Sequence, residues 1–215
     1  MIAKIRAKEF VKVNTTCSVM TILMCYVTAQ VKGHVERWIP MISDCFVYAP
    51  ESYMSRYGVI TFINYGTCVS NVIIAKVVED GSTYGRILEV LAVMSSLSFG
   101  MVGAVSEVEN ETVHNIFALS GFIMYGIYIM IINVRIEKWI GKTELMYNAL
   151  VMLRCVTMYG ELESYKPMVE WMVSLMYAYH MYKYGDKLGK YTIGIEEEHK
   201  EKEMDISKEL MAECH

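Results

Sequence analysis

Six apolar segments, each close to the length of a membrane-spanning helix, dominate this sequence of 215 residues. A helix needs roughly 20 predominantly apolar residues to cross the hydrocarbon core of a bilayer. The six segments cover residues 13–31, 57–77, 87–105, 114–134, 143–160 and 167–183. The first four carry at most one Asp, Glu, Lys or Arg each, whereas the last two are shorter and carry more charge. We expect an all-α fold, a polytopic membrane protein built as a six-transmembrane-helix bundle.

The composition favours a membrane domain with a polar tail. Hydrophobic residues make up 54% of the chain, yet the mean hydropathy is only +0.28. Residues 196–215 hold eight of the 24 acidic residues and lower that mean. A soluble helical bundle would show wide polar faces, which the second and fourth segments lack. The net charge of −4 gives no attraction to a nucleic-acid backbone, so membrane lipids and other proteins are the expected partners.

Lys and Arg residues predict the orientation, because they concentrate on the cytosolic side of membrane proteins. With both termini cytosolic, 15 of the 20 Lys and Arg residues face the cytosol and four face the lumen. The predicted parts are a cytosolic N-terminus (1–12), a transmembrane domain (13–183) and a cytosolic charged tail (184–215). A short structured lumenal loop, residues 32–56, follows the first span.

The cysteines predict neither a disulfide framework nor a metal site, and one sequon is a candidate for glycosylation. Cys45 is the only one of six Cys residues in the lumenal loop, and no pair has metal-ligand spacing. We therefore expect no disulfide framework, no metal and no cofactor. The Asn110-Glu111-Thr112 sequon lies between the third and fourth spans on the lumenal side, which makes Asn110 a glycosylation candidate.

The lumenal loop carries a recognisable motif. It reads GHV at 33–35, IPMISD at 39–44 and APES at 49–52. These residues resemble the GHV…PxISD…PPES signature of the damage-regulated autophagy modulator (DRAM) family. That family lies in a wider group with the GPI-anchor lipid-remodelling factor and the N-terminal hydrophobic domain of a yeast cell-wall protein. Ala49 stands here at the first Pro of PPES.

The resemblance continues into the later spans. FGMV at 99–102, Glu107 and His114 resemble the family's third and fourth spans, although Val105-Ser106 replaces its Phe-Gln pair. Glu170-Trp171 resembles the Glu-Trp pair that opens the last span. The resemblance implies a six-span protein of endolysosomal or Golgi membranes. For the autophagy-modulator branch it implies promotion of autophagy without known enzymatic chemistry.

The candidate site residues share a place on the predicted lumenal side. They are His34, Pro40, Ser43, Asp44, Pro50, Glu51, Ser52, Glu107 and His114. Histidine titrates between pH 5 and 8, so an acidic lumen would charge it beside these carboxylates. One hypothesis is a pH-sensitive site for a lipid headgroup or partner. The alternatives are a Pro-stiffened loop with Asp44 as a helix cap, and an acyl-transfer site using Ser43 or Ser52.

Two charges inside spans form a second candidate. Arg154 and Glu170 lie at similar depth on adjacent antiparallel segments, and intramembrane charges usually find partners. We predict an Arg154–Glu170 ion pair, which is a structural brace or part of the site.

The expected function is a non-enzymatic modulator of autophagy and lysosomal function in lysosomal or endosomal membranes. The alternatives are a Golgi factor that remodels GPI-anchor lipids and a regulator of a plasma-membrane lipid kinase. We expect no catalytic residue.

Overall fold

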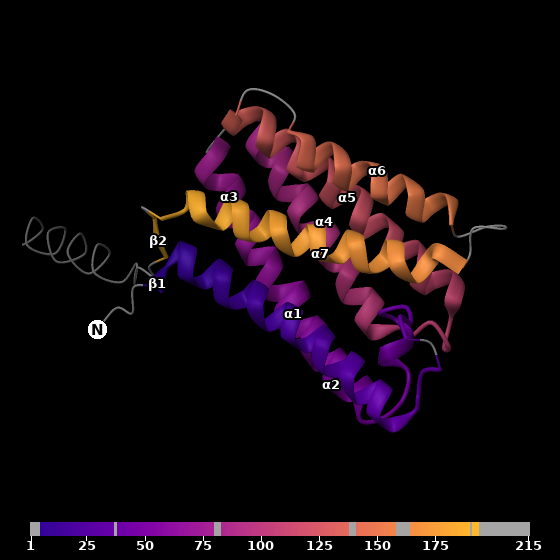
Figure 1. Cartoon of the computed structure of the whole chain (residues 1–215). Helices are drawn as coiled ribbons and strands as arrows, with labels where there is room; N and C mark the ends of the chain where they lie inside the picture. The colour runs from indigo at the N-terminus through magenta and orange to yellow at the C-terminus, as the bar shows by residue number, and fades with distance from the viewer. Residues whose placement is uncertain are drawn as a thin grey trace, which may run out of the picture.

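The computed structural model describes residues 5–36, 38–79, 83–137, 141–157, 164–189 and 191–193. The described residues form long helical rods packed side by side (Figure 1). The helices are α1 (Ala7–Lys32), α2 (Glu51–Gly58), η2 (Val59–Gly66), α3 (Thr67–Glu79), α4 (Thr83–Ala104), α5 (Glu111–Glu137), α6 (Lys142–Val156) and α7 (Lys166–Lys187). A short 3₁₀ turn, η1 (Asp44–Phe46), lies in the loop after α1. The segments α2, η2 and α3 follow one another without a break and make one rod.

Four rods are long and apolar enough to cross a membrane. They cover Ala7–Lys32, Glu51–Val78, Thr83–Ala104 and Glu111–Ile136. The expected all-α membrane fold is therefore confirmed. Helix α6, with 15 residues, and the more polar α7 fall outside this group, so the count of six spans stays a prediction.

The helix bounds differ from the apolar segments in one instructive place. The second rod begins at Glu51, six residues before the predicted start at 57. Four of the residues 51–56 are charged or polar (Glu51, Ser52, Ser55 and Arg56), so a hydropathy search misses them. Glu51 in the first turn nevertheless favours a helix N-terminus. The loop predicted at 32–56 therefore ends at Pro50, and its last six residues are helical.

The two described chain ends meet at one end of the bundle. Strands β1 (Ile5–Arg6) and β2 (Thr192–Ile193), which the hydropathy pattern did not predict, pair antiparallel there. Asp186 accepts from Lys12 and Lys8 of α1, each at 2.8 Å. These hydrogen bonds lower the pKa of Asp186 to about 2. The start of the predicted tail, residues 184–187, continues α7, and residues 194–215 lie outside the described part.

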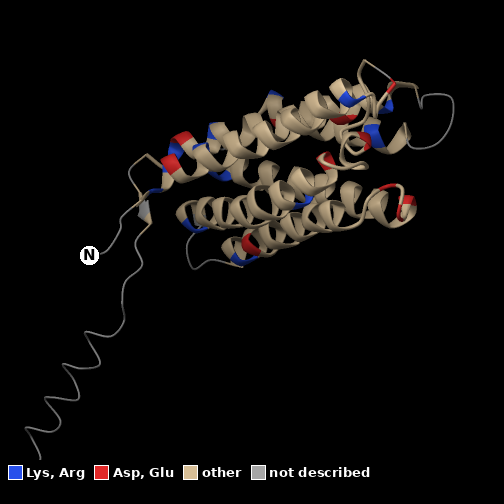
Figure 2. Cartoon of the chain, turned by 90° about the horizontal axis from the view of Figure 1, so that it is seen from below, with Lys and Arg blue, Asp and Glu red and all other residues tan. Residues whose placement is uncertain are grey.

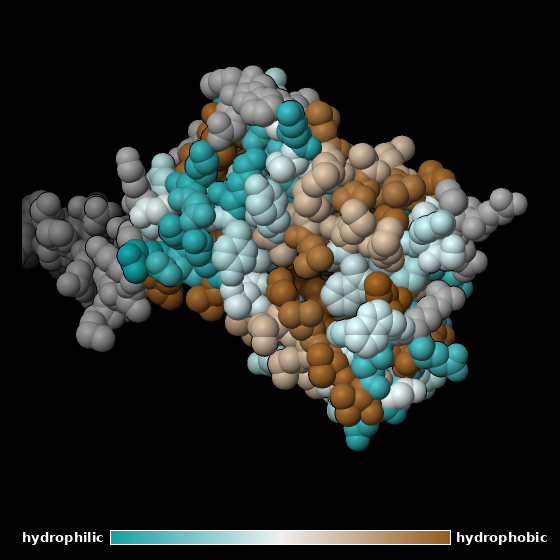
Figure 3. Space-filling view, in the orientation of Figure 1, coloured by the Kyte–Doolittle hydropathy of each residue, from teal (hydrophilic) through white to brown (hydrophobic). Residues whose placement is uncertain are grey.

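Charge and hydropathy are distributed as a membrane protein requires. Most of the charged residues lie toward the two ends of the rods (Figure 2). Hydrophobic side chains cover much of the middle of the face in Figure 3. Large apolar residues such as Met24, Leu97, Ile127 and Leu175 are exposed, which suits contact with lipid tails.

Glycines allow the first two rods to approach closely. A Cβ at Gly58 would collide with Thr21 of α1, and one at Gly66 would collide with Asn14. The two glycines thus make a contact surface for α1, as small residues do between membrane helices. Gly103 repeats the arrangement on α4, where a Cβ would lie 2.6 Å from Val59.

We predict that Gly66→Ala destabilises the protein by about 1–3 kcal/mol, because the added methyl overpacks the contact with α1. Thermal unfolding of the purified chain in detergent measures the change. Gly189→Ala is the matched control, because its Cβ would have no neighbour closer than 3.7 Å. Equal melting temperatures for both variants would contradict the close approach.

Candidate functional site

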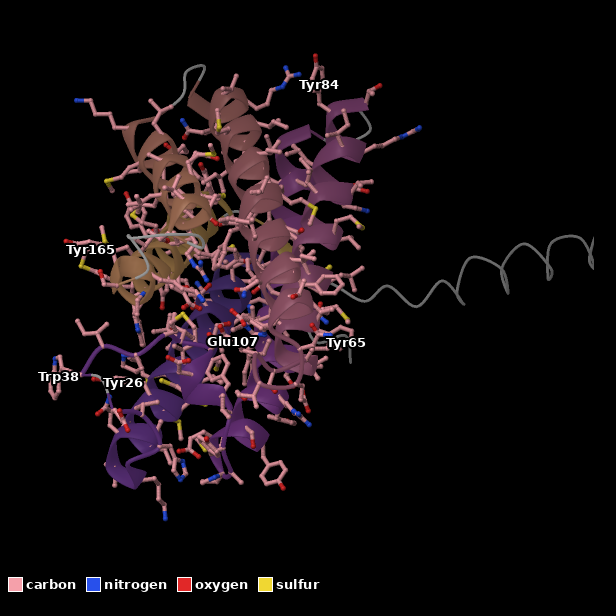
Figure 4. All side chains as sticks on the ribbon, turned by 90° about the vertical axis from the view of Figure 1, so that its right-hand side faces the viewer. Tyr26, Trp38, Tyr65, Tyr84, Glu107 and Tyr165 are labelled. Carbon is pink, nitrogen blue, oxygen red and sulfur yellow. The ribbon has the colours of Figure 1, made fainter. Side chains whose placement is uncertain are left out.

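The motif residues collect at the end of the bundle opposite to the paired strands, which we call the motif end. It contains the α1–α2 loop (33–50), the α4–α5 loop (105–110) and the first turns of α7. Figure 4 views this end, with Glu107 near its centre and Trp38 pointing outward from the α1–α2 loop. The sequence-predicted convergence of these segments is therefore visible in the structure.

His34 and Glu51 are paired across the ends of α1 and α2. Nδ1 of His34 lies 2.8 Å from Oε1 of Glu51, whose side chain is only 1% exposed. Gly33, with φ of 71°, ends α1 in a left-handed conformation and turns the chain toward this contact. The other Glu51 oxygen, Oε2, is buried without a hydrogen-bond partner. Because burying a charge is costly without partners, this pair holds the loop where it leaves α1.

The middle of the loop is attached to α7. The Trp171 indole N–H donates to the carbonyl oxygen of Pro40 at 2.9 Å. Tyr26 of α1 packs edge-on against the Trp171 ring, with centroids 5.6 Å apart, and donates to the carbonyl of Trp38. The first proline of the loop motif and the tryptophan of the Glu-Trp pair therefore meet, although 131 positions separate them.

Glu107 connects three segments. Its Oε2 accepts from the Ser43 hydroxyl at 2.7 Å, and its Oε1 lies 3.4 Å from Nζ of Lys166. The Glu107 and Lys166 side chains are only 14% and 10% exposed. Glu107 thereby joins the α1–α2 loop, the α4–α5 loop and the start of α7. Ser43, the predicted nucleophile candidate, contacts this carboxylate.

The remaining loop residues have local roles. Oδ2 of Asp44 accepts from the backbone N–H of Met41 at 3.1 Å, so it closes a turn upstream of η1. Cys45 is buried with Cys25 and Ala29 of α1, and burial raises its pKa to about 12. Pro50 precedes α2, and its carbonyl accepts from two later amides. Ser52 lies in the first turn of α2, and its backbone N–H donates to the carbonyl oxygen of Tyr48.

The α4–α5 loop is capped at both ends. Oδ1 of Asn110 accepts from the Val113 amide at 3.0 Å, which makes the glycosylation candidate a cap of α5. His114 is buried and donates from Nδ1 to the carbonyl of Val105 at 2.7 Å. Hydrogen bonds from Ser106 and Arg56 lower the pKa of Glu109. His34 therefore meets a carboxylate as predicted, whereas His114 contacts the backbone after α4.

Arg154 and Glu170 are brought near each other without touching. The charge of Arg154 acts on the Glu170 carboxyl, yet no salt bridge within 4.0 Å joins these two described residues. Nη1 of Arg154 and Oε2 of Glu170 are buried and have no hydrogen-bond partner. The predicted similar depth agrees with this proximity, but the direct pair is not formed in this structure.

Two hollows adjoin the motif residues. A partly open cavity of about 100 Å³, which we call the inner cavity, is lined mainly by apolar side chains of the helices. Ser43 and Glu170 are two of its polar lining residues. A wider and more polar cleft of about 620 Å³ is lined by His34, Asp44 and Glu107, among others. Loop residues Ile42 and Ser43 line the cavity, while the adjoining Met41 and Asp44 line the cleft. The α1–α2 loop thus lines both hollows.

The sequence interpretation missed a charged pair at the opposite end. Glu144 of α6 is fully buried and accepts from Lys183 of α7 at 2.6 Å and from Tyr184 at 2.9 Å. His180 of α7 is also fully buried, with Nε2 3.6 Å from Oε1 of Glu144. The depth argument used for Arg154 and Glu170 also applies here, because Glu144 and Lys183 lie at corresponding ends of neighbouring segments.

No group of three or more His, Cys, Asp or Glu side chains in the described ranges is arranged to hold a metal ion. The site instead offers carboxylates, hydroxyls and aromatic rings around an apolar cavity. Such a set can bind a polar or cationic group.

A helical bundle with four membrane-length rods and an apolar exterior defines an integral membrane protein. The family model Frag1, described as the Frag1/DRAM/Sfk1/Cwh43P N-terminal domain, matches residues 9–184. The chain belongs to this family, which confirms the resemblance carried by the loop motif. No curated protein and no solved structure matches the chain significantly.

We predict that Glu107→Ala destabilises the protein by about 2–3 kcal/mol, because it leaves Lys166 and Ser43 without their shared acceptor. Ser43→Ala should cost about 1 kcal/mol, since it removes one hydrogen bond. Thermal unfolding in detergent measures both changes. Glu109→Ala is the control from the same loop, because its ion pair with Arg56 is exposed. A loss for Glu109→Ala as large as that for Glu107→Ala would contradict the connecting role of Glu107.

We predict that Lys183→Met costs about 3 kcal/mol, because it strips a buried carboxylate of its cation. Adding Glu144→Gln to this variant should recover part of the loss, since the unpaired charge is then removed. Comparing the melting temperatures of the single and double variants tests the pair. Lys76→Met, an exposed residue on α3, serves as control. A double variant no more stable than Lys183→Met would disprove the charge argument.

Proposed function

We propose that the chain spans the membrane six times, with the motif end in the lumen and both termini in the cytosol. The contacts of α6 and α7 support this topology. Glu144 and Lys183 bind each other, and Arg154 and Glu170 face the protein interior. Charged side chains that face the protein interior are tolerated in membrane-spanning helices. They also lower the mean hydropathy of such a helix, as in α6 and α7.

We further propose that the protein is a non-enzymatic membrane modulator of autophagy and lysosomal function. One observation carries this proposal. The residues that resemble the autophagy-modulator signature bind one another across the fold, as His34 with Glu51, Pro40 with Trp171, and Ser43 with Glu107. The hydroxyl of Ser43 faces a carboxylate instead of a histidine base, an arrangement that suits a binding site better than acyl transfer.

A specific observation favours one second candidate. The inner cavity beside the motif is lined largely by apolar side chains, which suits a factor that handles lipids, such as a GPI-anchor remodelling factor of the Golgi. Regulation of a plasma-membrane lipid kinase through Glu196–His215 is a third candidate, and those residues lie outside the described part.

The test combines localisation with rescue. The chain, tagged at its C-terminus and expressed at low level, should colocalise with lysosomal markers. Loss of the gene should lower autophagic flux, and the wild-type chain and Glu109→Ala should restore it. Glu107→Ala should restore it poorly at equal protein level. Golgi staining with altered anchor lipids would instead support the remodelling factor. Failure of a chain lacking residues 196–215 would support the kinase regulator.

A further inference from the structure

The Glu170 carboxyl is the unusual element of the inner cavity. Its Oε2 oxygen is buried without a hydrogen-bond partner, and Glu170 is the one acidic residue among the described residues that line the cavity. Buried polar groups nearly always have partners, so an unpartnered carboxyl oxygen beside a cavity is a candidate contact for a ligand. A carboxylate in an apolar wall is complementary to a cation that carries hydrogen-bond donors.

The shape of the cavity restricts the apolar part of such a ligand. Its lining includes Val19 and Ile22 of α1, Val59 and Ile63 of η2, and Phe99 of α4. An empty apolar cavity of about 150 Å³ is known to bind benzene in other proteins. A cavity of about 100 Å³ therefore suits a short segment of one hydrocarbon chain better than two chains side by side.

The adjoining cleft restricts the head of the ligand. Four acidic residues line it (Glu36, Asp44, Glu107 and Glu111), against Lys166 and His34 as bases. Lys166 is already bound to Glu107, and His34 to Glu51. The cleft therefore has a net negative charge, which attracts a positively charged group. Ser43 lines the cavity and donates to Glu107, which lines the cleft, so the two hollows adjoin each other.

We propose that the cavity and the cleft together bind a single-chain cationic amphiphile, a long-chain primary amine of the sphingoid-base type. The ammonium group binds Glu170 at the boundary formed by Ile42 and Ser43. The hydrocarbon chain enters the inner cavity, and hydroxyl groups next to the amine face the cleft. This inference names a ligand for the motif-end site of the proposed function.

The experiment uses the purified full-length chain in nanodiscs of dioleoyl phosphatidylcholine. The probe is a sphingosine that carries a photoreactive diazirine in its chain and an alkyne for detection. Labelling should be saturable and competed by sphingosine, but not by stearic acid or lysophosphatidylcholine. The labelled peptides should include residues that line the cavity, from the 42–46 or 174–181 segment.

Glu170→Gln keeps the shape of the side chain and should lower the affinity at least about tenfold, the effect of losing one charge-assisted hydrogen bond. Glu109→Gln is the matched control and should bind normally, because Glu109 lines neither hollow. The double variant Glu36→Gln with Glu111→Gln alters only exposed cleft residues, which protects the test against misfolding. It should weaken binding as well.

Three results would overturn the proposal: equal competition by stearic acid, unchanged affinity of both the Glu170→Gln and the double variant, or labels outside the cavity. Competition by stearic acid alone would indicate an anionic lipid. Because the measurement uses no cells, it is independent of localisation and autophagic flux. Failure here leaves the proposed function standing, and failure of that function leaves the binding result standing.

Discussion

The motif end depends on one partly buried carboxylate, that of Glu107. An acidic side chain between helices is costly unless donors surround it, and Ser43 and Lys166 supply those donors. The three residues come from segments that share no helix, so satisfying one carboxylate positions two loops and the start of α7. The sequence motif is therefore a set of contacts. Glu107 in one loop requires Ser43 in another, just as Pro40 requires the indole of Trp171.

A second carboxylate does the same at the other end. Glu144 binds Lys183 and Tyr184, which fixes α6 against α7. Between the two ends, α7 contacts the α4–α5 side through aromatic rings, with Tyr177 against Phe99 at 5.4 Å and against Tyr125 at 4.0 Å. Polar contacts at both ends and bulky rings in the middle leave the inner cavity beside α7. The cavity is thus a consequence of how α7 is held.

Sequence patterns predicted the parts of this architecture that depend on local composition. Runs of apolar residues located every rod, because hydropathy reflects lipid contact, but they missed the first turns of α2, where Glu51 and Arg56 are polar and helical. Periodicity did not predict η2, a π-helix from Val59 to Gly66, whose last residue packs against Asn14 of α1. The family motif identified His34, Ser43, Glu51 and Glu107, but their pairing, and the contact of Glu107 with Lys166, are set by tertiary packing.

The same reasoning explains why Arg154 and Glu170 do not form the predicted pair. The positions of two residues along antiparallel segments predict that they lie at the same depth in the membrane. They do not determine how far apart the two side chains are across the helix interface. Glu144 and Lys183 lie within contact distance, whereas Glu170 lines the inner cavity. Nothing in the described part of the chain gives its Oε2 a hydrogen bond, and Arg154 acts on it only from beyond 4.0 Å. Without a direct ion pair, the Glu170 carboxyl stabilises the fold less than a paired carboxyl would. Proteins accept such a loss of stability at functional sites, which agrees with a role of Glu170 in ligand binding.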